Sequence, residues 1–75
     1  MRRQRMPAQS LTAGVTVYDA AGASVGTLDR YDARGGYLVA RRGVFFPRDM
    51  YIPLHAFRET DARGNVRLDV RLGDL

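Results

Sequence analysis

Cysteine, lysine and tryptophan are absent from this sequence of 75 residues. Without cysteine, the chain can form neither a disulfide nor a thiolate–metal site. A chain this short also buries only about 60% of its unfolded surface, so its core is thin. We therefore expect one small domain that lacks covalent reinforcement. The missing lysine leaves arginine as the only strongly basic residue, which codon usage explains better than function does.

Long apolar runs are absent as well. No stretch of about 18 apolar residues occurs, so no membrane-spanning helix is predicted. The first five residues hold Arg2, Arg3 and Arg5, and a signal peptide also begins with basic residues. Pro7 and polar residues follow them where a signal peptide has an apolar segment. We therefore expect a cytoplasmic protein.

The chain divides into a basic tail and a nearly neutral body. Residues 1–10 are basic and polar, and we expect a flexible tail there. Residues 11–75 form the predicted domain, with nine arginines against eight acidic residues. A contact with nucleic acid would therefore depend largely on the charge of the tail.

The sequence predicts an all-β domain with no convincing helix. Short runs rich in β-branched and aromatic residues alternate with turns that contain glycine or aspartate. The predicted strands cover residues 11–18, 23–31, 37–41, 50–52, 57–61 and 66–70. Pro53 cannot donate to a ladder and should start a tight 3₁₀ turn over residues 54–56. About six short strands favour a small antiparallel β-barrel, in which closure removes the exposed edges.

Two irregularities are expected in the first three strands. Val25 and Leu28 are three residues apart, which breaks strict alternation, and Gly26 between them indicates a bulge. The strand at residues 37–41 is apolar on both faces, which predicts a strand covered on both sides for part of its length.

The last hairpin is predicted to have a four-residue loop. This register pairs Phe57 with Val70 on the inner face and Arg58 with Asp69 on the outer face. It also turns Glu59 toward the apolar side, which a bulge near Arg58 would correct. Residues 72–75 are expected to fray.

Several motifs, in this order, resemble the PRC-barrel family across residues 11–75. They are Val17-Tyr18-Asp19-Ala20-Ala21-Gly22 followed by Val25-Gly26-Thr27-Leu28, then Leu38-Val39-Ala40-Arg41-Arg42-Gly43, then Tyr51-Ile52-Pro53-Leu54 with Ala56-Phe57, and finally Val66-Arg67-Leu68-Asp69-Val70. They are similar to the family's opening hairpin, central strand, apolar-Pro-apolar element and closing strand.

The resemblance implies a binding role. The family is named for the cytoplasmic domain of the photosynthetic reaction centre H subunit, and a related barrel ends the ribosome maturation factor of the small subunit. Stand-alone copies occur in bacteria and archaea, some of them linked to stress responses. The family's work is protein–protein contact, without shared catalytic residues. The resemblance thus implies a bacterial or archaeal interaction module that is not an enzyme and has no cofactor.

No catalytic, cofactor-binding or metal-binding residue is predicted from the chain itself. His55 is the only histidine and has no neighbouring pattern of metal ligands. Asp19, Asp29 and Asp32 lack the spacing of a calcium loop, so we expect Asp19 and Asp32 to open turns and Asp29 to face outward. Gly35-Gly36 precedes a strand, so it is no phosphate loop.

The segment over residues 44–50 holds the predicted protein-interaction surface. Its candidate residues are Val44, Phe45, Phe46, Pro47, Arg48 and Met50. Neighbouring residues of an extended chain point in opposite directions, so one Phe is expected to plug the barrel while the other faces out. In the alternative, both tuck under the loop and close the open end of the barrel. We expect self-association into a homodimer through this loop or through an exposed strand edge.

A second interpretation is a ribosome- or nucleic-acid-associated module. Its candidate residues are Arg2, Arg3, Arg5, Arg41 and Arg42, together with exposed tyrosines among Tyr18, Tyr31, Tyr37 and Tyr51. Aromatic side chains interleaved with arginine can stack bases. The nearly neutral body favours the protein-binding interpretation over this one.

Overall fold

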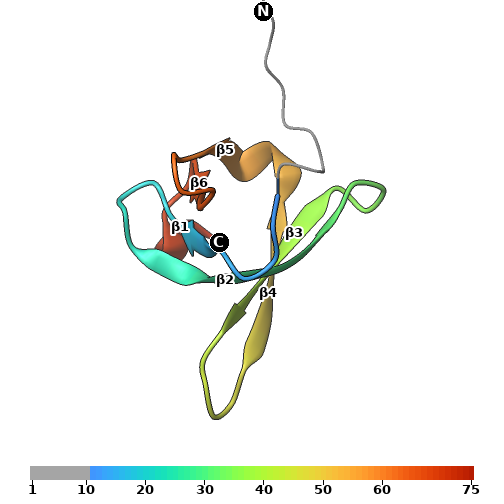
Figure 1. The fold of residues 1–75 in the computed structure, drawn as a ribbon, viewed down its shortest axis with the longest axis vertical. Helices are drawn as coiled ribbons and strands as arrows, with labels where there is room; N and C mark the ends of the chain where they lie inside the picture. Colours follow the sequence, from blue (N-terminus) through green and yellow to red (C-terminus); the bar gives the residue numbers. More distant parts are fainter. Residues whose placement is uncertain (1–10) are drawn as a thin grey trace, which may run out of the picture.

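The computed structural model describes residues 11–75, which form six strands and two short 3₁₀ turns (Figure 1). In chain order these are β1 (Thr16–Tyr18), β2 (Ser24–Asp32), β3 (Tyr37–Arg42), β4 (Arg48–Pro53), η2 (Leu54–Ala56), β5 (Phe57–Thr60), β6 (Val66–Leu68) and η3 (Leu72–Asp74). The prediction of an all-β domain with six short strands and a 3₁₀ turn after Pro53 is confirmed. The first strand is shorter than predicted, and η3 stands where a frayed end was expected.

The strands form one mixed sheet in the order β4-β3-β2-β1-β6-β5. Neighbouring strands run antiparallel except β1 and β6, which are parallel. The sheet curls around its core, but within residues 11–75 its edge strands β4 and β5 do not pair. The prediction of a wholly antiparallel, closed barrel is therefore wrong in two details, the parallel pair and the open edges. Pro53 ends β4 and η2 carries the chain away from its edge, so the sheet remains open at this corner.

The core draws residues from five strands and from η2. Its buried apolar members are Val17, Val25, Leu28, Leu38, Ala40, Ile52, Ala56, Val66 and Leu68. Val25 and Leu28 can both face inward because Tyr18 pairs with Ser24 while Val17 pairs with Gly26, which leaves Val25 as an extra residue. The bulge predicted at Gly26 is therefore present beside it.

Strand β3 is covered on both faces, as predicted. Leu38 and Ala40 belong to the core, whereas Val39 faces the opposite side and is fully buried there as well. Val39 lies between Arg30 on β2 and Tyr51 on β4 in the register of the sheet. The side chains of the outer face of the sheet therefore cover an apolar residue.

The predicted register of the last hairpin is wrong by one residue next to the loop and by two residues at Phe57. Phe57 pairs with Leu68, and the pairing shifts between Phe57 and Glu59, which places the anticipated bulge at Arg58. The carboxylate of Asp61 accepts the N–H groups of Arg63 and Asn65, both at 2.9 Å, so the loop begins at Asp61. A five-residue loop forms in place of the predicted four, which shifts the strand pairing by one residue, and the bulge at Arg58 adds a second.

The carboxylate of Asp19 ties the first turn to the C-terminal end. Its Oδ1 accepts the N–H groups of Ala21 at 2.9 Å and Ala23 at 2.8 Å, and its Oδ2 accepts that of Leu72 at 2.8 Å. Asp19 is only 3% exposed. The aspartate predicted to open a turn therefore also anchors η3 to that turn.

Candidate functional site

The hairpin of β3 and β4 extends beyond the rest of the sheet. Pairing between β2 and β3 ends at Thr27 and Arg41, whereas pairing between β3 and β4 continues to Arg42 and Arg48. The five residues 43–47, which we call the hairpin tip, therefore depend on their own two strands for support. Figure 1 shows the tip projecting away from the other strands.

The two ends of the hairpin tip restrict its conformation. Gly43 has a φ of +91°, and a Cβ at this position would lie 3.0 Å from the carbonyl oxygen of Phe46. Only glycine adopts this conformation without strain in so little space. At the other end, the ring of Pro47 fixes its own φ. The tip is therefore shaped by its own sequence before any partner binds.

Three consecutive apolar residues of the tip are exposed. Val44 is 85% exposed, and Phe45 and Phe46 are each 88% exposed. Neither phenylalanine plugs the barrel and the loop does not cover them, so both expectations for their burial are wrong. The cause is the length of the hairpin, which carries the tip beyond the core. Each Phe presents on the order of 150–200 Å², so the tip rivals the largest apolar patch of an ordinary monomer.

The other residues of the predicted protein-interaction surface separate into two groups. Met50 is half-buried, pairs with Ala40 and packs against the core, so it does not belong to the tip. Arg48 is exposed and stands at the foot of the tip, directly opposite Arg42. The structure thus brings together one arginine from each of the two predicted surfaces.

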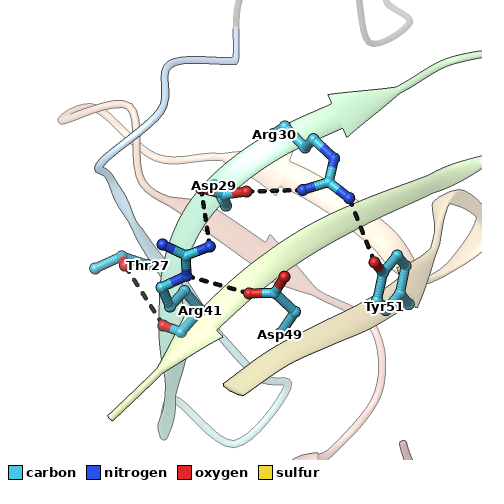
Figure 2. Close-up of polar contacts among 6 residues, drawn as sticks. All are labelled: Thr27, Asp29, Arg30, Arg41, Asp49 and Tyr51. Atoms are coloured by element: carbon cyan, nitrogen blue, oxygen red, sulfur yellow. Dashed lines mark hydrogen bonds and ion pairs between the residues drawn. The ribbon is translucent and has the colours of Figure 1, made fainter. Parts of the chain in front are cut away.

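Arg41 belongs instead to a network on the outer face of the sheet (Figure 2). Its Nε donates to Asp49 at 3.1 Å, and its Nη2 lies 3.9 Å from Asp29. Asp29 also pairs with Arg30 at 2.9 Å, so it faces outward as predicted. These ion pairs are exposed and contribute little to stability. Because Arg41 already pairs with two carboxylates, its guanidinium group is less available to an anion of a partner.

Tyr51 completes this outer network. Arg30 donates to its hydroxyl at 3.3 Å and lies 5.9 Å from its ring centroid, while Tyr37 packs edge-on at 5.2 Å. A hydrogen bond to Asp32 raises the pKa of Tyr37. Tyr51 is 56% exposed, whereas the other three tyrosines are half-buried. The predicted tyrosine platform is therefore reduced to Tyr51.

A shallow recess lies at the foot of the hairpin, where β3 separates from β2. It is lined by Thr16, Ser24, Gly26, Thr27, Arg41, Arg42, Gly43 and Val44. Gly26 permits the close approach of the strands here, since a Cβ would lie 2.5 Å from the carbonyl oxygen of Arg41. The recess is open to solvent and adjoins the tip at Gly43 and Val44.

No protein-family profile and no curated protein matches the chain. Its structure does match a crystal structure of RimM from Pseudomonas aeruginosa, a protein assigned to 16S ribosomal RNA processing. The TM-score is 0.64 and the sequence identity is 21%. The chain has the fold of part of RimM.

The match covers 93% of this chain but only 46% of the RimM chain, so the chain spans about half the length of that protein. At this identity the likeness to RimM concerns the fold alone.

The remaining candidates form no further site in the described part of the chain. Between residues 11 and 75, no cluster of three or more His, Cys, Asp or Glu side chains could hold a metal ion. His55 is exposed in η2. No helix within that range has the length and apolar character needed to cross a membrane. Arg2, Arg3 and Arg5 lie outside the described residues.

The pairing of Arg42 with Arg48 was missed by sequence reasoning. The two residues belong to different predicted surfaces because the sequence predicts a loop over residues 44–50 rather than the start of a paired strand. The signal was present in the arrangement Arg42-Gly43 and Pro47-Arg48, in which turn residues are flanked symmetrically by arginine. A hairpin centred on the two phenylalanines brings these arginines opposite each other.

Proposed function

We propose that this chain is a cytoplasmic, non-catalytic binding module of the PRC-barrel family that associates with the small ribosomal subunit or its precursors. Its family motifs and the fold that it shares with part of RimM support this proposal. The observation that carries the binding role is the exposure of Phe45 and Phe46 on a projecting hairpin. RimM is assigned to ribosomal RNA processing, which makes ribosomal particles the first partner to test.

The tip has the physical properties of a contact surface. Phe45 and Phe46 lie outside the core, so they stabilise the free domain little. Burying either side chain against a partner would contribute about 1.5–3 kcal/mol. Because Gly43 and Pro47 already restrict the tip, little conformational entropy is lost on binding. These properties favour binding over a purely structural role.

Replacing both phenylalanines by serine is expected to weaken association with ribosomes roughly 100-fold. The reason is that the double substitution removes the apolar surface that a partner would cover. Co-sedimentation with purified, salt-washed small subunits measures the affinity, and circular dichroism measures the melting temperature, which should stay nearly unchanged.

Leu75→Ser is the matched control for this experiment, because Leu75 is a 43% exposed apolar residue outside the hairpin. It should leave sedimentation unaffected. If the unaltered chain does not sediment with the subunits, ribosome association is wrong. If the double variant sediments as strongly as the unaltered chain, the tip is not the contact.

The homodimer is a second proposal, which the edge position of β4 favours. Strand β4 pairs only with β3 among the strands of residues 11–75, so its outer backbone groups can accept a second copy. Static light scattering at roughly 100 μM chain should then give the mass of a dimer. A monomeric mass at that concentration would exclude self-association of the free chain.

A further inference from the structure

We infer that Arg42, Arg48 and the hairpin tip form one docking surface for a protein that offers an apolar socket with an acidic rim. The inference rests on the proposed function and names the class of partner within the ribosomal particle. The apolar half of this surface is Val44, Phe45 and Phe46, and its charged half is the arginine pair beneath them.

The arginine pair is an unfavourable arrangement for the free domain. Arg42 and Arg48 are direct cross-strand partners, and like charges in such positions repel. The next pair along the hairpin, Arg41 and Asp49, has opposite charges joined at 3.1 Å. Within residues 11–75, every ion pair involves Arg30 or Arg41, and no carboxylate lies within 4 Å of Arg42 or Arg48. The described part of the chain therefore leaves this repulsion uncompensated.

The position of the pair specifies the charge of the partner. Residues 42–48 carry two arginines and no acidic residue, and the arginines flank the apolar tip on both strands. A partner that covers the tip would also remove water from the guanidinium groups, which is unfavourable unless anions replace that water. Carboxylates meet this need with charge-assisted hydrogen bonds in a forked geometry. The socket must therefore carry acidic groups at its rim.

The apolar half of the surface favours protein over RNA. Val44 is 85% exposed and has no π face to stack on a base. The two phenylalanines alone present on the order of 300–400 Å², a large part of the roughly 800 Å² that each partner buries in a standard protein interface. The near-neutral charge of residues 11–75 also gives a polyanion little long-range attraction.

A second copy of the chain is not a fitting occupant of this surface. In a two-fold symmetric contact between tips, the same patch of both copies would meet. That contact would bring two Arg42 and two Arg48 side chains together, which adds to the repulsion. The partner must therefore differ from this chain, even if β4 edges pair in a dimer.

Photo-crosslinking from the tip tests the inference directly. The full chain with Phe45→p-benzoylphenylalanine, and a second variant with the same substitution at Phe46, would be irradiated with salt-washed small ribosomal subunits. The expected product is an adduct between the chain and a protein. This adduct survives ribonuclease, whereas an adduct with RNA does not. Its yield should fall at least 10-fold when Arg42→Glu and Arg48→Glu are added.

Arg58→Glu with Arg71→Glu is the matched control, because both side chains are exposed and the net charge changes equally. It should change the yield less than about 2-fold. Arg42→Glu with Arg48→Glu exchanges one like-charged pair for another, so the folded domain should persist.

An adduct with RNA would overturn the protein partner while leaving ribosome association intact. Sedimentation of both photoreactive variants without any adduct would overturn the tip as the contact. If the adduct yield falls equally in the two charge-reversed double variants, the acidic rim is wrong and the attraction is a general electrostatic one. Absence of sedimentation for the unaltered chain would refute the proposed function, and this inference with it.

Discussion

Replacing Asp19 with alanine is expected to lower the melting temperature of the domain by roughly 10–20 °C. The substitution removes the acceptor for the N–H groups of Ala21, Ala23 and Leu72, in a place where water has little access. It also releases η3 from the first turn. Thermal unfolding followed by circular dichroism measures the loss.

The stabilising effect of Asp19 should depend on pH. The N–H groups of Leu72 and then Ala23 hold the pKa of its carboxyl group below the ordinary value of 3.8. The folded state therefore binds this proton less readily than the unfolded state does. Its contribution is complete above the unfolded pKa and is lost as the pH falls through the lowered folded pKa. Unfolding in acid should show this loss below about pH 4.

Two variants separate this effect from a general loss of charge. Asp19→Asn keeps one of the two acceptor oxygens, so its melting temperature should lie between those of the unaltered chain and Asp19→Ala, with less pH dependence. Asp69→Ala removes an exposed carboxylate and should change the melting temperature little. Equal melting temperatures for Asp19→Ala and Asp69→Ala would show that the anchor does not stabilise the fold.

Gly26→Ala is expected to be at least as destabilising, with a fall in melting temperature of roughly 15 °C or more. The φ of Gly26 is +154°, which L residues rarely adopt, and the new Cβ would lie 2.5 Å from the carbonyl oxygen of Arg41. Because the obstacle is backbone, β2 and β3 must separate at the foot of the hairpin. Thermal unfolding measures the loss, and displaced amide resonances in β3 would locate it.

Gly22→Ala is the matched control for Gly26→Ala. Gly22 also has a positive φ, +88°, but a Cβ there would meet nothing within 4 Å. Its substitution introduces only backbone strain, for which a fall of roughly 5–10 °C is expected. The difference between the two variants isolates the steric clash. If the melting temperature falls equally in Gly26→Ala and Gly22→Ala, the steric clash at Gly26 costs no stability.

Some features of this protein follow from short stretches of sequence. Alternation and turn residues located all six strands, and Pro53 located the 3₁₀ turn, because these choices depend on neighbouring residues. Val25 and Leu28 indicated the bulge, since both must face the core although they are three residues apart. The two apolar faces of β3 likewise indicated that Val39 is buried.

The register of the last hairpin could not be fixed in this way. Side chains alternate with a period of two, so pairing Phe57 with Val70 or with Leu68 buries the same faces. The loop that begins at Asp61 and the bulge at Arg58 decide between the two registers, because each contributes one residue of the shift. The parallel pairing of β1 with β6 similarly joins segments almost 50 residues apart, for which no local pattern exists.

The candidate site shows the same division. The sequence by itself determined that Val44, Phe45 and Phe46 form an apolar segment between glycine and proline. Only the tertiary structure decided that both phenylalanines are exposed and that Arg42 stands opposite Arg48. The physical reason is that exposure depends on where β2 stops supporting β3, and this point is set by pairing between strands rather than by the residues of the tip.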